Sequence, residues 1–241
     1  DPSRVPTQAA WEAGREAFDQ LLATHRSKTG KTPQKLTFTL WSVETMRHFG
    51  LLEAQALWAL GVEPVWDAGG RVSDVRLVPR AALGRPRVDV VLSATGLYRD
   101  HFPNVMRLLA KAARLAAEAG DEVDNPVAAN SRRIAADLKA KGWSEGQALN
   151  AAQTRIFSSE SGRYGTGLDD AALATDTWKG KAEGDRKLAS LYLSRMQFGY
   201  GPDEDSWGQP GARSENLYAT HLRGTEGAVL SRTSNLYGIL T

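Results

Sequence analysis

The sequence of 241 residues contains no cysteine, and this absence removes several classes of protein at once. A disulfide-stabilised scaffold, a zinc site with thiolate ligands and a cysteine nucleophile all require that residue. A chain without cysteine is compatible with a reducing compartment, and we expect this one in the cytoplasm.

Charge of one sign and long apolar runs are also scarce. Thirty Lys and Arg residues against 28 Asp and Glu leave a formal net charge of only +2. Proteins that bind nucleic acid gather basic residues on one surface, so this balance argues against nucleic acid as a partner. No run of 18 apolar residues occurs, so we expect no membrane span.

The two ends of the sequence resemble the interior of a longer chain. No basic stretch leads into an apolar one after Asp1, so no signal peptide is visible. The last residues, 236–241, are mostly apolar, whereas a natural terminus is more often polar. We therefore interpret the sequence as a piece of a longer protein.

The residues that are present have the composition of a folded protein, with 41% hydrophobic and 24% charged residues. The patterns predict an α/β fold: a small Rossmann-like α/β layer over 35–120 with a predominantly helical extension. An N-terminal helical segment over 1–34 precedes the layer, and a mainly helical region with Gly-rich loops over 121–241 follows it.

Periodicity and turn residues give approximate bounds for the elements. We expect strands over 35–41, 62–66, 72–78 and 88–93. We expect helices over 7–25, 43–60, 103–119, 130–141, 144–156, 185–197 and, with a break at Gly224, 214–232. The stretches 94–102 and 158–168 are expected to be loops, and 199–213 a mobile loop, because it has Gly, Pro and acidic residues and little to bury.

The end of the first strand is a candidate site. Ligands of open α/β sheets bind beyond the carboxyl ends of the strands, and Trp41 lies at such an end. Glu44 and His48 follow four residues apart, so they share one helix face. A carboxylate beside an imidazole can move protons or bind a metal. In the plainer alternative, Glu44 complements the helix dipole and His48 is a solvated neighbour.

The end of the strand over 88–93 is a second candidate. Gly96 permits a sharp turn there, and Tyr98, Arg99 and Asp100 present hydrogen-bonding groups together. An arginine at this place can clamp a carboxylate or amide of a ligand. The alternative is a surface ion pair between Arg99 and Asp100 beside a helix cap.

Nucleotide binding by this chain is not predicted. The glycines at 162, 165 and 167 are not followed by Lys and Ser or Thr, and no strand leads from them into a helix. No Ser-His-Asp or His-x-x-x-His arrangement is present either.

Two long strings resemble a known family. They are LTFTLWSVETMRHFGLLEAQALWALGVEPVWDAGGRV over 36–72 and RPRVDVVLSATGLYRDHFPNVMRLLAKAARLAA over 85–117. They are similar to the large subunit of cobaltochelatase, which is related to the H subunit of magnesium chelatase. The resemblance continues through 155–157, 164–168, 191–195 and 224–229, and covers nearly the whole chain.

The resemblance implies an ATP-dependent chelatase that inserts a divalent metal into a tetrapyrrole. It implies Co(II) and hydrogenobyrinic acid a,c-diamide as substrates, in cobalamin biosynthesis, with ATP and Mg²⁺ bound by separate AAA+ subunits. The magnesium–protoporphyrin branch and a non-catalytic scaffold domain remain alternatives. The chain departs from the family at Ser42–Val43 and over 158–162, which suggests a subfamily.

Under this interpretation Glu44 and His48 are the expected catalytic pair and the transient ligands of the incoming metal. The residues expected to contact the tetrapyrrole are Trp41, Arg47, Tyr98, Arg99, Asp100 and Tyr164.

Overall fold

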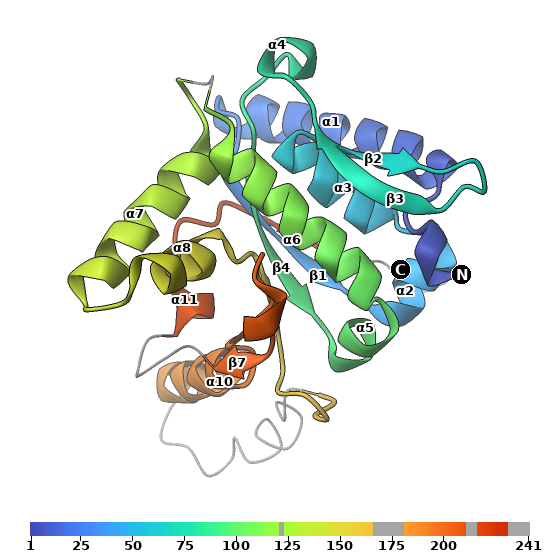
Figure 1. Cartoon of the computed structure of the whole chain (residues 1–241). Coiled ribbons are helices and arrows are strands. Elements are labelled where there is room, and N and C mark those ends of the chain that lie inside the picture. The colour runs from blue at the N-terminus through green and yellow to red at the C-terminus, as the bar shows by residue number, and fades with distance from the viewer. Residues whose placement is uncertain (121–122, 166–180, 211–215, 231–241) are drawn as a thin grey trace.

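The computed structural model describes residues 1–120, 123–165, 181–210 and 216–230. The predicted α/β class is confirmed (Figure 1). The helices are α1 (Gln8–Thr29), α2 (Ser42–His48), α3 (Leu51–Leu60), α4 (Arg80–Leu83), α5 (Gly96–His101), α6 (Pro103–Glu118), α7 (Pro126–Ala140), α8 (Glu145–Gln153), α10 (Lys181–Arg195) and α11 (Leu217–Leu222), with short 3₁₀ turns η1 (Pro2–Arg4) and η3 (Glu204–Ser206).

The main sheet has, among the described residues, six strands in the order β7-β6-β5-β4-β1-β8. The strands are β1 (Lys35–Leu40), β4 (Asp89–Ala94), β5 (Ile156–Ser158), β6 (Phe198–Gly199), β7 (Gln209–Pro210) and β8 (Ala228–Val229). β1 is parallel to β4 and β8, and β4 is parallel to β5, whereas β6 and β7 add antiparallel pairs at one side. Strands from beyond residue 120 therefore complete the layer that begins at Lys35.

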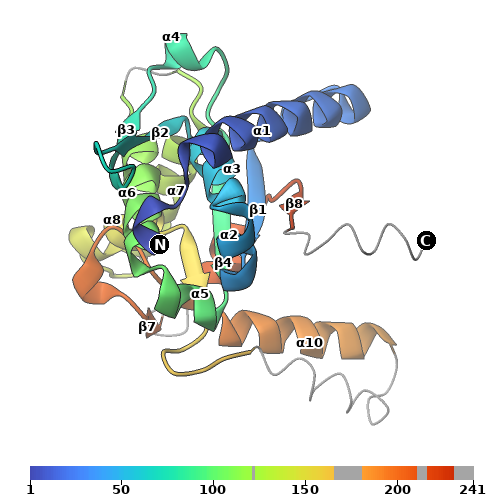
Figure 2. The same cartoon turned by 90° about the vertical axis from the view of Figure 1, so that its right-hand side faces the viewer.

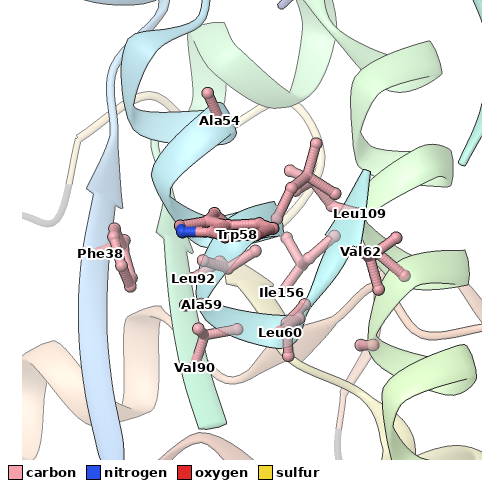
Figure 3. Close-up of a cluster of buried hydrophobic side chains, with 14 of the residues drawn as sticks. Phe38, Ala54, Trp58, Ala59, Leu60, Val62, Val90, Leu92, Leu109 and Ile156 are labelled. Carbon is pink, nitrogen blue, oxygen red and sulfur yellow. The ribbon is translucent and has the colours of Figure 1, made fainter. Parts of the chain in front are cut away.

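Helices cover both faces of this sheet, which explains why every residue of β4 is buried. Leu36, Phe38, Val90, Leu92 and Ile156 join a large cluster with side chains of α1, α3 and α6 (Figure 3). The alternate residues Val91 and Phe157 belong to a second cluster, with side chains of α7, α8 and α11. The period of two in the strands thus divides one sheet between two cores.

A separate antiparallel hairpin of β2 (Val62–Trp66) and β3 (Val72–Leu77) packs against α6, and α1 packs along α3 (Figure 2). Gly14 permits that second contact, because a Cβ there would lie 2.5 Å from the Cβ of Ala54. Both strands of the hairpin were predicted from the alternating pattern.

The expected single helix over 43–60 is two helices. Phe49 and Gly50 both adopt the left-handed conformation, with φ of 53° and 91°, and this ends α2. The carbonyl of Phe49 accepts a hydrogen bond from the N–H of Thr7, which fixes the break from outside. Periodicity continues across the break, so the pattern gave no sign of it.

Three other expectations need correction. The stretch 94–102 is not all loop, because Thr95 caps the short helix α5. The expected helix over 214–232 is reduced to α11, followed by β8, and residues 214–215 and 231–232 lie outside the described part. Ile156 begins β5 rather than ending a helix.

The predicted mobile loop over 199–213 is wrong where it is described, up to residue 210. β6 and β7 form a hairpin there, with η3 between them. Tyr200 is buried and its ring packs on Trp207, whose indole N–H donates to the carbonyl of Gly201. These two aromatic anchors supply the burial that composition did not suggest.

A buried ionic cluster ties the later segments to the amino ends of β1 and β4. The Arg155 guanidinium lies 2.7 Å from Asp89 Oδ1, and both side chains are fully buried. His221 on α11 donates to or accepts from its surroundings at two points, Ala151 O at 2.9 Å and Arg155 Nη1 at 3.4 Å. Burial, and then Arg155, lower the pKa of His221 well below its ordinary value.

Candidate functional site

The two candidate strand ends lie side by side. β1 and β4 are neighbours and parallel, so α2 and α5 begin at the same edge of the sheet (Figures 1 and 2). The N–H of Thr95 donates to the carbonyl of Leu40, and the Ser42 hydroxyl lies 2.7 Å from His101 Nδ1. Segments 60 residues apart in the chain therefore form one surface.

Glu44 and His48 meet as the spacing predicted. His48 Nε2 lies 3.1 Å from Glu44 Oε2, and Arg47 Nη1 lies 3.6 Å from Glu44 Oε1. The Glu44 side chain is only 2% exposed, whereas those of Arg47 and His48 are about half exposed. The carboxylate is thus shielded from bulk water and reaches it through an imidazole, an arrangement suited to proton transfer.

A second buried carboxyl group, Glu53 on α3, lies behind this pair. The Thr45 hydroxyl donates to Glu53 Oε1 at 2.6 Å, and the Tyr98 hydroxyl faces the same carboxyl group. Burial raises the pKa of Glu53 above its ordinary value, and burial followed by the Glu53 charge raises that of Tyr98. The sequence signal that could have found Glu53 is a single acidic residue within the apolar string of 51–60.

Tyr98 and Arg99, expected at the substrate surface, are both buried. Arg99 Nη1 donates to the carbonyls of Ser159 and Glu160 at 2.8 and 3.0 Å, and Nε donates to Asp100 Oδ1 at 2.9 Å. The guanidinium is therefore engaged by the protein itself. Geometry separates these two residues from the exposed candidates.

Tyr164 joins the site through Asp100. Its hydroxyl donates to Asp100 Oδ2 at 2.6 Å, and its ring lies 6.0 Å from the Arg99 guanidinium carbon. The hydrogen bond from Tyr164, and then that from Arg99, lower the pKa of Asp100. Tyr164 is 61% exposed, so the ring reaches solvent while the hydroxyl is held.

Large apolar side chains are exposed around these polar groups. They are Trp41, Val43, Met46 and Phe49 on and beside α2, and Leu97 on α5, each about half exposed. Phe49 in addition holds a left-handed conformation that a non-glycine residue rarely adopts, a feature frequent at functional sites. Exposed apolar residues gathered on one short helix are typical of a surface that another molecule covers.

Glu44 and His48 offer two donors for a metal ion. Within the described ranges no group of three or more His, Asp and Glu side chains is placed to hold one. Two donors suit brief contact with a substrate metal better than permanent binding. Within the same ranges, no helix is long and apolar enough to cross a membrane.

Comparisons with known proteins place the chain. The family model described as CobN/Magnesium Chelatase matches residues 1–241. The chain is 34% identical, over its whole length, to the aerobic cobaltochelatase subunit CobN of Sinorhizobium sp, and covers 18% of that protein. It is 36% identical over 204 residues to the chloroplastic magnesium-chelatase subunit ChlH of Oryza sativa subsp. indica, which is 84% of this chain and 14% of that protein.

A solved structure agrees. The fold matches the catalytic subunit of cobaltochelatase from Mycobacterium tuberculosis with a TM-score of 0.83 and 36% sequence identity, over 95% of this chain and 18% of that one. The chain thus spans less than a fifth of the length of these relatives. The resemblance drawn from the sequence is confirmed, and the chain belongs to the CobN/magnesium chelatase family.

Proposed function

We propose that the chain is a tetrapyrrole-facing part of the large subunit of an ATP-dependent cobaltochelatase. Its substrates are Co(II) and hydrogenobyrinic acid a,c-diamide, and its product belongs to cobalamin biosynthesis in the cytoplasm. The observation that carries the proposal is the shielded Glu44–His48 pair at the sheet edge, with exposed apolar side chains around it. The whole-length match to a cobaltochelatase subunit and the likeness to a solved cobaltochelatase favour cobalt over magnesium.

Metal insertion replaces two pyrrole N–H protons by one divalent cation, so the reaction needs a base. Glu44 is the group we assign to this role: its carboxylate accepts a ring proton, and His48 passes the proton to water through its exposed side. Between proton transfers, the same carboxylate and imidazole hold the incoming Co(II) and release it to the ring nitrogens. The two protons leave to solvent and the ring nitrogens keep their electron pairs for the metal.

The exposed groups around the pair would hold the ring. Trp41 and its apolar neighbours on α2 present the apolar surface that a macrocycle face requires. Arg47 is a half-exposed cation at the same place, suited to the carboxylates at the ring periphery. Tyr98, Arg99 and Asp100 then act from behind, because the structure engages them with protein groups.

ATP hydrolysis is assigned to separate AAA+ subunits that carry ATP and Mg²⁺. The support is the sequence itself, in which the glycines of 162–167 lack the Lys and Ser or Thr of a phosphate loop. The large subunit would then receive the energy of hydrolysis through contact with these partners.

Absorption titration tests the binding claim. The 241-residue chain is titrated with hydrogenobyrinic acid a,c-diamide and, separately, with protoporphyrin IX, and each spectrum is followed for a saturable shift. We expect the corrin precursor to bind more tightly. Tighter binding of protoporphyrin would assign the chain to the magnesium branch. Binding of neither, together with binding of AAA+ subunits, would support the scaffold alternative and contradict the proposal.

A further inference from the structure

Residues 159–165 form a short loop that lies directly on the first turn of α5. A Cβ built at Gly96 would lie 2.6 Å from the carbonyl oxygen of Arg163 and 3.0 Å from Cδ1 of Tyr164. Real Cβ atoms do not approach a backbone oxygen so closely, so the contact depends on glycine. The loop could not keep this position with any other residue at 96.

Arg99 and Asp100 hold the same loop at both of its ends. Arg99 donates to two successive carbonyls where the loop begins, those of Ser159 and Glu160, and Asp100 accepts from Tyr164 where it ends. Inside the loop, the Ser159 hydroxyl donates to the carbonyl of Arg163 at 2.8 Å. An exposed loop is thereby fixed by three ties to one short helix.

The ties determine what Tyr164 presents. Its hydroxyl is engaged by Asp100, and one part of its ring faces the Arg99 guanidinium, while 61% of the residue is exposed. An aromatic ring held in one orientation loses little conformational entropy when a ligand stacks on it. A merely structural tyrosine would bury the ring and leave the hydroxyl in water, which is the reverse arrangement.

We propose that Gly96, Arg99 and Asp100 are positioning residues that hold Tyr164 as an orienting contact for the tetrapyrrole. This inference rests on the proposed function, because it gives Tyr164 a ligand at the edge where Glu44 lies. It reassigns Arg99 and Asp100 from direct contact with the ring substituents to the support of one exposed aromatic side chain.

The position of the loop is tested first, without a ligand. Trypsin cleaves after Arg163, so the rate at the 163–164 bond, followed by mass spectrometry, reports release of the loop. We expect Gly96→Ala to accelerate this cleavage at least several-fold. Gly146→Ala is the matched control, because Gly146 lies in α8 with open space around its Cβ position. Equal rates in the Gly96 variant and the wild type would overturn the proposal.

Tyr164→Phe provides a second variant that leaves the packing around Gly96 intact. It keeps the ring and removes only the hydrogen bond to Asp100, so we expect a cleavage rate between those of the wild type and Gly96→Ala. This variant keeps the test decisive if Gly96→Ala fails to give a cooperative thermal melt.

Binding is tested with the same two tetrapyrroles. We expect Tyr164→Ala to weaken the Kd about three- to tenfold, the size of an aromatic contact, and Gly96→Ala to weaken it similarly. The double variant should be no weaker than Tyr164→Ala alone, since Gly96 acts through Tyr164. Additive losses, or unchanged Kd values in a wild-type background that binds, would refute the positioning role and leave the proposed function standing. A wild-type chain that binds neither tetrapyrrole would refute both.

Discussion

Replacement of Glu44 by glutamine separates chemistry from structure at the proposed site. Glutamine keeps the shape of the side chain and one hydrogen-bonding oxygen toward His48, but loses the charge and the ability to take a proton. General bases contribute about 10²- to 10⁴-fold to rate. We therefore expect Glu44→Gln, in a large subunit that carries this chain, to reduce metal insertion by at least about 100-fold.

The cost in stability should be small by comparison. Glu44 lies in the first turn of α2, where a negative charge is worth about 0.3–1 kcal/mol. The ion pair with Arg47 spans 3.6 Å to a half-exposed partner, and such pairs contribute about 0–1 kcal/mol. The bond to His48 persists in neutral form. Together these losses amount to about 1–2 kcal/mol, against a typical total of about 5–15 kcal/mol.

Two measurements on one variant decide the matter. The insertion rate is followed by the absorption of the metallated ring, and the free energy of unfolding by urea titration. Glu145→Gln is the control, because Glu145 also lies in the first turn of a helix and its side chain is 88% exposed. Wild-type insertion by Glu44→Gln would refute the assignment of the base and leave Glu44 as a partner of the helix dipole.

Four further predictions concern the chain as a whole. The 241-residue chain should unfold in a single cooperative thermal transition, because one sheet joins both of its halves, and a featureless melt would contradict this. The purified chain alone should insert no metal, and turnover without partner subunits would refute the division of labour proposed here. Asp89→Asn should lose about 3–5 kcal/mol in urea titration, since it leaves the buried Arg155 charge unpaired, and a loss below about 1 kcal/mol would be inconsistent with that pair. Stability should also fall as the pH drops through about 6.5, because the unfolded state binds a proton at His221 that the folded state refuses. His221→Gln should remove this part of the slope between pH 7.5 and 5.5, and identical slopes would exclude His221 as its source.

The catalytic pair was predictable because it is local. Glu44 and His48 lie four residues apart on one helix, and the 3.1 Å contact follows from helical geometry once α2 forms. The strands β1 to β4 and the start of α6 at Pro103 were visible for the same reason, since alternation and capping involve neighbouring residues. The family resemblance added the expected chemistry.

The remainder of the site depended on contacts between distant segments. Glu53 lies behind Glu44 only because α3 folds back across the break at Phe49 and Gly50. The burial of Arg99 depends on the carbonyls of Ser159 and Glu160, some 60 residues further along.

The sequence by itself determined which segments are strands and helices, where a carboxylate meets an imidazole, and which family the chain resembles. These properties come from side chains within a few residues of one another. Only the tertiary structure decided that Tyr98 and Arg99 face inward while Tyr164 faces outward. Exposure is a property of what packs on a residue, and here the packing partners come from β5 and the loop after it.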